Sequence, residues 1–241
     1  EKRPLLDGER QKIGDFWTMN SEQYITNMVN IVEDKLKKEG LELKGKNRRC
    51  QGIFPTNYKP ELDATDECDR EHASWYRQII GMLRWAVELG RFDVLVEISI
   101  MSQYQANPRM GHLEALYAIV HHLKQGHARA VIFDPTTPPV DEKSFAECDA
   151  SDWTDFYGDM KEEDPRDMPE PLGKPVTITV FVDANHAGNV VTRRSHTGVL
   201  ILVQNTVTTA YCKKQNTVES ATYGSELVAM RIARDLVVAT R

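Results

Sequence analysis

The sequence predicts an α+β protein in which a mostly helical part precedes a small three-stranded antiparallel sheet with one helix. Three observations support this fold class. Apolar residues recur at helical spacing between residues 69 and 127. Short β-branched runs separated by polar turns follow residue 175. An acidic, proline-rich stretch, residues 134–175, lies between them and marks a domain boundary.

The N-terminal region predicts a short strand and then a long helix. Residues 12–20 have the composition of a strand, and Asn20 with Gln23 three residues later is typical of a helix start. The helix is expected to reach about Lys38, with helically spaced positions Tyr24, Met28, Ile31, Val32, Lys35 and Leu36. A Lys- and Arg-rich run over 35–49 and a proline-containing linker follow, and we expect no regular structure in the linker.

Residues 69–127 predict three helices that form a small bundle. Gly90, the Asn107–Pro108 pair and Gly126 are expected to end them in turn. The aromatic and aliphatic residues of the first helix are interpreted as core: Trp75, Ile79, Met82, Leu83, Trp85 and Ala86. His112, His121 and His122 lack the spacing of a metal motif and are interpreted as histidines on the bundle surface.

The C-terminal region predicts strands at 176–184, 197–204 and 207–213 and a helix at about 218–239, after a short strand at 130–133. The gap at Asn205–Thr206 predicts a hairpin. Both alternating sets of the first of these three strands are largely β-branched or aromatic. That pattern favours a central, buried strand.

Composition limits the classes of function. The net charge of -6 argues against a surface that is basic throughout, although local basic patches remain compatible with it. No apolar run is long enough for a membrane span, so no membrane partner is expected. Four scattered cysteines without a CxxC pair predict reduced thiols in an intracellular protein. The chain begins without Met, and we expect it to be a piece of a longer protein.

Two acidic residues are the candidate catalytic and metal-binding pair. Asp183 ends a β-rich run, and Glu226 lies on the helix that follows the next two strands. An acid that ends an apolar strand is costly unless it has a role. Carboxylates held between a sheet and a helix can bind the Mg²⁺ ions that activate water and stabilise a leaving oxygen in phosphodiester cleavage. We therefore expect Asp183 and Glu226 to bind Mg²⁺ or Mn²⁺.

Several motifs together resemble the Pol polyprotein of copia-type LTR retrotransposons, from the end of the reverse transcriptase into the RNase H domain. The motifs are FVDANHAG, TRRSHTG, KKQNTVE and SELVAM in the C-terminal part, and WYRQIIGMLRW and NPRMGHLEALYAIVHHLK upstream. The family usually has an acid where this chain has Asn185, and often a Trp at His186. The resemblance covers nearly the whole chain.

The resemblance implies three regions. Residues 1–133 would be the helical connection or thumb-like region of the reverse transcriptase, 134–175 an acidic linker, and 176–241 a truncated RNase H-like domain. The paired aspartates of the polymerase have no counterpart, so we expect no polymerisation. The third RNase H acid would lie on a strand beyond Arg241, so we expect weak metal binding and impaired hydrolysis of RNA in RNA/DNA hybrids.

The implied partners are an RNA/DNA hybrid and the remainder of the polyprotein, within a cytoplasmic particle or the nucleus. Backbone phosphates and 2′-hydroxyls, which proteins contact in such duplexes, would meet these candidate binding residues: Arg193, Arg194, Lys213, Lys214, Ser220, Thr222 and Ser225. Without its neighbouring strands, the first strand of this domain would be an exposed edge. We expect the acidic segment or a partner to cover that edge, or the chain to self-associate.

Two other classes of function stay open from the sequence. One is a non-catalytic nucleic-acid-binding or scaffolding module that keeps the fold without the chemistry. The other is a metal-dependent nuclease or integrase-like domain built on the same sheet.

Overall fold

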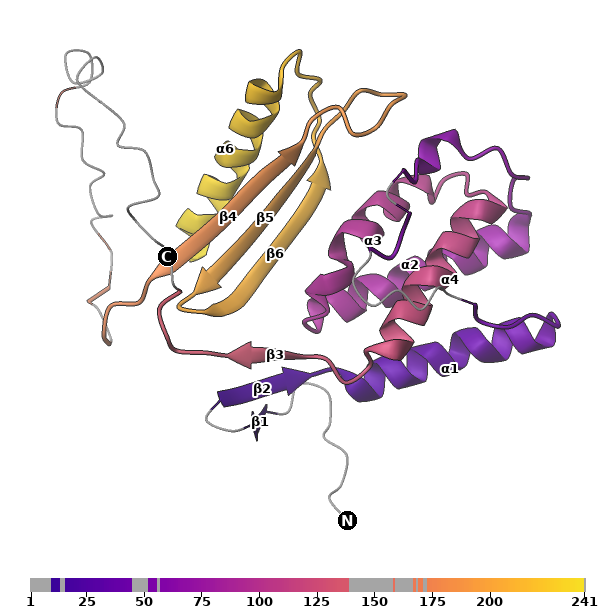
Figure 1. Ribbon diagram of the computed structural model, residues 1–241, viewed down its shortest axis with the longest axis horizontal. Coiled ribbons are helices and arrows are strands. Elements are labelled where there is room, and N and C mark those ends of the chain that lie inside the picture. The colour runs from indigo at the N-terminus through magenta and orange to yellow at the C-terminus, as the bar shows by residue number, and fades with distance from the viewer. Residues whose placement is uncertain are drawn as a thin grey trace.

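The computed structural model describes residues 10–13, 16–44, 52–55, 57–138, 158, 167, 169–170 and 173–240 (Figure 1). Its architecture is α+β, with a helical part and two three-stranded antiparallel sheets among these residues. No helix in the described ranges is long and apolar enough to cross a bilayer. The predicted acidic linker, 134–175, lies mostly outside the described residues, as do Cys50 and Cys148.

The helical part contains α1 (Glu22–Lys38), α2 (Arg70–Glu88), α3 (Leu95–Met101) and α4 (Met110–Gln125), with a 3-10 turn η1 (Pro60–Leu62) in the linker before α2. The four helices follow the predicted order. The linker before α2 was predicted to have no regular structure, and the turn η1 shows that this prediction was wrong for Pro60–Leu62. The chain turns after α2 because Gly90 adopts a φ of 95°, which L-residues rarely tolerate. Its own amide donates to Val87 O at 2.9 Å.

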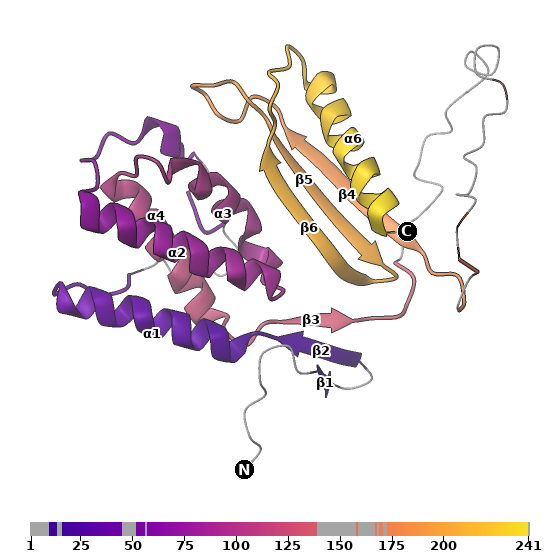
Figure 2. The ribbon, with the colours of Figure 1, turned by 180° about the vertical axis from the view of Figure 1, so that it is seen from behind.

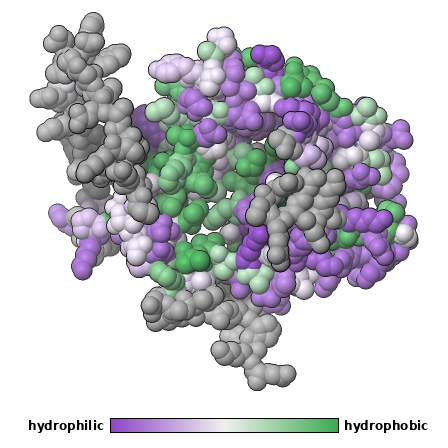
Figure 3. Space-filling view, in the orientation of Figure 1, coloured by the Kyte–Doolittle hydropathy of each residue, from purple (hydrophilic) through white to green (hydrophobic). Residues whose placement is uncertain are grey.

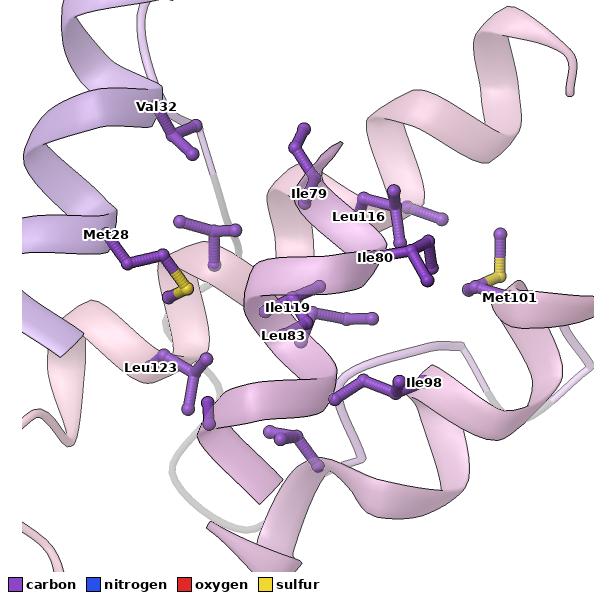
Figure 4. Close-up of a cluster of buried hydrophobic side chains, with 14 of the residues drawn as sticks. Met28, Val32, Ile79, Ile80, Leu83, Ile98, Met101, Leu116, Ile119 and Leu123 are labelled. Atoms are coloured by element: carbon purple, nitrogen blue, oxygen red, sulfur yellow. The ribbon is translucent and has the colours of Figure 1, made fainter. Parts of the chain in front are cut away.

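The helices bury a single apolar core. Figure 4 shows side chains from all four helices meeting around α2. Ile79 and Leu83 of α2, with Leu116 and Ile119 of α4, have no exposed surface. One residue predicted to join the core does not. Trp85 is 55% exposed, because α2 presents only one stripe to its neighbours.

The first sheet joins the two ends of the helical part. Its strands are β1 (Arg10–Ile13), β2 (Phe16–Asn20) and β3 (Ala130–Phe133), in the order β1-β2-β3. Both pairings are antiparallel, with Trp17 opposite Phe133 in one of them. The sequence predicted one N-terminal strand where the structure has a hairpin. The pairing with β3 connects residues more than a hundred positions apart, which local patterns do not encode.

The second sheet consists of β4 (Ile178–Asn185), β5 (His196–Val203) and β6 (Thr206–Lys214), and α6 (Thr222–Thr240) covers one of its faces. Figure 1 looks at the open face, and Figure 2 shows α6 in front of the sheet from behind. The hairpin lies at Gln204–Asn205, one position before the predicted gap. Its first residue, Gln204, has a φ of 54°.

Strand alternation gives the two faces of this sheet different roles. Val182, Val199 and Tyr211 are in register on the three strands and pack with α6 residues such as Ala233. The residues between them, including Asp183 and Gly198, therefore point to the other face. There, Phe181 is 54% exposed and Leu200 is 41% exposed, and Figure 3 shows an apolar area over this part of the sheet.

The order β4-β5-β6 makes β5 the central strand and leaves β4 at an edge. The composition of β4 had predicted a central, buried strand, and within the described residues that prediction is wrong. The resemblance had also predicted that β4 would be an edge strand, and among the described residues no strand pairs with its outer side. The opposite edge, at β6, is contacted by α3, whose Ser99 Oγ donates to Cys212 O at 2.9 Å.

Polar contacts also join the two sheets and the loop after β4 to the helical part. Asp134, directly after β3, receives a hydrogen bond on its backbone oxygen from Asn205 N at 3.2 Å and donates from its own amide to Thr206 Oγ1 at 2.8 Å. Lys59 Nζ donates to Gly188 O at 3.0 Å, and Val190 N donates to Glu61 Oε1 at 2.8 Å. These bonds place the loop between β4 and β5 against η1.

Candidate functional site

The two candidate metal ligands lie at the same end of the second sheet. His186, directly after β4, has its Nδ1 3.3 Å from Ser225 Oγ in the first turn of α6. Asp183 is three residues before that contact and Glu226 is one residue after it. The end of β4 and the start of α6 are therefore adjacent, as the metal prediction requires.

The side chains of the pair point in different directions. Glu226 lies two helical turns before Ala233, which packs on the sheet, so the carboxylate of Glu226 is on the sheet-facing side of α6. Asp183 is exposed on the face away from α6, because its neighbours Val182 and Ala184 face the helix. The backbone of β4 thus separates the two carboxylates. Among the described residues, no three His, Cys, Asp or Glu side chains form a group that could hold a metal.

A row of polar side chains crosses all three strands on the open face. Asn185, His196 and Lys214 are directly opposite one another, and we call these three residues the polar row. Side chains at paired positions of an antiparallel sheet project from the same face about 5 Å apart. The next row on this face contains Asp183, Gly198 and Cys212, and Asp183 is therefore diagonal to His196.

Gly198 leaves an opening in the middle of that second row. A Cβ added at this glycine would meet no atom within 4 Å. The opening lies between Asp183 at the β4 edge and Cys212, which is partly covered by α3. Burial raises the pKa of the Cys212 thiol. The hydrogen bond with Ser99 lowers this pKa, and the negative charge of Glu97 raises it.

The predicted arginine pair lies in a well-defined turn beside the polar row. Asn189 is 7% exposed, and its Oδ1 accepts hydrogen bonds from Thr192 N at 2.7 Å and Thr192 Oγ1 at 2.9 Å. Its backbone bonds to Arg193 and Arg194 close the turn, and Arg193 adopts a φ of 57°. Arg193 is exposed and Arg194 half-exposed, so this turn presents two guanidinium groups at the open end of the sheet.

The predicted lysine pair divides between the two faces. Lys214 is in the polar row, and Lys213, one residue earlier, is exposed on the opposite side of β6. Burial, with the nearby Arg194 guanidinium, lowers the pKa of Lys214. A nearby anion would offset the effect of Arg194 and favour the charged form of Lys214.

Of the predicted hydroxyl donors, Ser220 and Thr222 are exposed, but Ser225 is not available to a ligand. Its side chain has no exposed surface, and its Oγ donates to Thr222 O at 2.7 Å. Ser225 instead belongs to a buried network in which Gln215 Nε2 donates to Ser225 O at 2.9 Å and to Thr197 Oγ1 at 3.0 Å. This network ties the start of α6 to β5.

Sequence reasoning missed His196 and Gln103, which meet between β5 and the 3-10 turn η3 (Ser102–Tyr104) that follows α3. Gln103 Nε2 lies 2.8 Å from His196 Nε2, so the amide donates to the neutral ring. The signal that indicates a role for His196 in binding is its position opposite Lys214. This strand register cannot be read from the sequence. The interpretation of His112 was also wrong: it is 3% exposed, with Nε2 2.9 Å from Pro60 O.

Comparison with family models, curated proteins and solved structures finds no match for this chain.

Proposed function

We propose that this chain is a piece of a copia-type retrotransposon Pol polyprotein. It would comprise the connection region and the first half of an RNase H-like domain. The parent activity would be metal-dependent hydrolysis of the RNA strand of RNA/DNA hybrids during reverse transcription, inside the cell. The observation that carries this proposal is the element order β4-β5-β6-α6, with Asp183 near the end of the first strand and Glu226 in the helix adjacent to it.

The donor atoms suit the proposed metal in kind but are few. Mg²⁺ prefers hard oxygen ligands and keeps several waters, so the carboxylates of Asp183 and Glu226 and the amide oxygen of Asn185 are suitable donors. When bound, Mg²⁺ would lower the pKa of a coordinated water and stabilise the leaving oxygen. Asp183 and Asn185 share one face, whereas Glu226 approaches from the other. We therefore expect weak metal binding.

A second function, binding of a hybrid without cleavage, is favoured by a specific observation. The cationic groups are already presented at one end of the sheet, on the turn held by Asn189 and in the polar row. The two carboxylates, in contrast, are separated by β4. Phosphate contacts contribute most of the sequence-independent affinity for nucleic acid. For this chain by itself, we propose hybrid binding with cleavage below that of a complete site.

The test is an assay of binding and cleavage on an end-labelled RNA/DNA hybrid with Mg²⁺ and then Mn²⁺. We expect the chain, Asp183→Asn and Glu226→Gln all to bind the hybrid, and none to cleave it measurably. Asp34→Asn, which changes an exposed acid on α1, serves as the matched control for a lost negative charge. Cleavage that disappears in both site variants would show that the chain holds a working site. Failure to bind the hybrid would contradict both functions.

The position of β4 at the edge of the described sheet leads to a prediction about self-association. An edge strand with apolar residues presents unpaired backbone groups to other chains, and a lysine on such a strand opposes pairing. We expect the chain to associate in a concentration-dependent way and Phe181→Lys to weaken that association, measured by sedimentation velocity. Ile31→Lys, an equally exposed apolar position on α1, should leave it unchanged. Equal effects of both substitutions would point to general solubility instead of the edge.

A further inference from the structure

His196 lies beside cationic side chains whose positive charge a phosphate group would balance. It lies opposite Lys214 in the polar row, and Arg194 is two residues before it. In addition to burial, the Arg194 guanidinium lowers the pKa of Lys214, and the Lys214 ammonium in turn lowers the pKa of His196. The turn before β5 and the end of β6 thus bring two cations to an imidazole that can become a third.

The imidazole is held in a way that suits both of its charge states. In the neutral ring, Nε2 accepts from the amide nitrogen of Gln103. The other amide atom of Gln103, Oε1, is buried and has no partner among the described residues. If the amide turned over, this acceptor would face a protonated ring, which donates from both nitrogens. Gln103 can therefore hold the ring in one position before and after protonation.

We propose that His196 binds a backbone phosphate of the nucleic acid together with Lys214 and Arg194, and takes up a proton when it does so. This inference rests on the proposed hybrid binding, and it identifies a contact residue that the sequence did not indicate. A phosphate, with its formal negative charge and its acceptor oxygens, matches two cations and an imidazole N–H. Lys213 and Arg193 would add contacts farther along the backbone.

The electrostatics of the free protein support a proton uptake on binding. Burial, with the neighbouring Lys214, lowers the pKa of His196, although Glu61 acts in the opposite direction. The ring is thus mainly neutral near neutral pH in the free chain. A phosphate beside it would favour the charged form and raise its pKa. Affinity for the hybrid should therefore increase as the pH falls through the interval between these two pKa values.

Other titratable groups near this corner must be separated from the effect of His196. They lie on β4, β6, α3, η1 and the segment after β4: Asp183, Cys212, Lys214, Glu97, Glu61 and His186. Burial raises the pKa of Glu97, so its protonation at low pH would also favour an anion. Substitution of His196 leaves all of these groups in place. The part of the pH dependence that this substitution removes belongs to His196.

The experiment measures the affinity of the full chain for a fluorescently labelled RNA/DNA hybrid without divalent metal at constant ionic strength. Constant ionic strength is needed because phosphate contacts make affinity depend on salt. Between about pH 7.5 and about pH 5.5, we expect up to about a tenfold decrease in the apparent Kd. His196→Gln should remove most of this pH dependence, because glutamine keeps an amide donor but cannot take up a proton.

His127→Gln is the matched control. His127 is exposed after α4, with Nε2 3.4 Å from Glu22 in the helical part, and its substitution should preserve the full pH dependence. Binding that does not change with pH, or a pH dependence that persists in His196→Gln, would overturn the role of His196 while leaving hybrid binding intact. A chain that binds no hybrid at either pH would contradict the proposed function itself.

Discussion

Asp93→Asn is expected to lower the free energy of unfolding by about 3 to 5 kcal/mol, because removal of one partner of a buried ion pair leaves the other charge uncompensated. Arg91 is only 2% exposed. Its Nε and Nη2 donate to the two carboxylate oxygens of Asp93, each at 2.9 Å. Its remaining nitrogen, Nη1, is buried and has no partner among the described residues. The guanidinium thus depends on Asp93 for its charge compensation.

Asp93 also connects distant parts of the helical region. Its Oδ2 accepts from Arg129 Nη1 at 2.8 Å and lies 3.2 Å from His122 Nε2. The carboxylate therefore links the turn after α2 with α4 and the residues just before β3. Loss of its charge should weaken that link and also leave the buried guanidinium of Arg91 without a counter-charge.

The same group predicts a dependence of stability on pH. Burial by itself would raise the pKa of Asp93, but hydrogen bonds from His122, Arg91 and Arg129 hold it well below its usual range. A carboxyl group whose folded pKa is depressed stabilises the fold fully above its unfolded pKa, about 4. That stabilisation decreases as the pH falls below this value toward the folded pKa. Urea unfolding between neutral and acidic pH would measure it.

Asp34→Asn provides the comparison on the surface. Asp34 forms an exposed pair with Lys37 at 3.8 Å, and such pairs contribute about 0 to 1 kcal/mol. We expect this variant to unfold like the unaltered chain and to keep its acid sensitivity, whereas Asp93→Asn should lose most of the decrease in stability at low pH. Equal stability of the two variants would show that the Arg91–Asp93 pair contributes no more than a surface pair.

Leu83→Ala is expected to destabilise the helical part by about 2 to 5 kcal/mol without a matching effect on the second sheet. Leu83 has no exposed surface and lies in the core that unites the four helices. The cluster between β4–β6 and α6 is separate and much smaller, with Val199, Ile201 and Ala233 as its buried members. Because the two cores share no residue, we expect the parts to open independently.

Hydrogen exchange followed by mass spectrometry would report both parts in one experiment. In the unaltered chain, the amides of β4 and α6 should exchange faster than those of α2 and α4. Leu83→Ala should accelerate exchange in the helices and leave the sheet unchanged. Trp85→Ala, two residues later but 55% exposed, should have a much smaller effect on either part. A common increase in exchange across the whole chain would show that the parts unfold as one cooperative unit.

The sequence predicted most of the local structure correctly. Helical periodicity placed α1, α2 and α4, since a stripe of apolar residues on one side of a helix is a local property. Gly90 was expected at the end of α2, because its lack of a side chain permits the φ of 95° there. Patterns of β-branched residues predicted β4, β5 and β6 within a few positions.

Errors arose where the environment of a residue depends on distant parts of the chain. Trp85 looked like a core residue by spacing but lies on the outer side of α2. His112 looked like a surface residue, yet it is buried between α4 and the linker, where it bonds to Pro60 O. Ser225 looked like a donor for a ligand, although its hydroxyl is used within its own helix turn. In each case, local spacing does not specify which neighbour covers the side chain.

By itself, the sequence determined most of the elements, their order and the acidic and basic residues available at the candidate site. The tertiary structure decided how these side chains are combined. Register placed His196 between Asn185 and Lys214 and set Asp183 on the face away from α6. The physical reason is that a strand alternates its side chains between two faces, so its function depends on which face each neighbour covers. That choice is made by contacts between segments far apart in the chain.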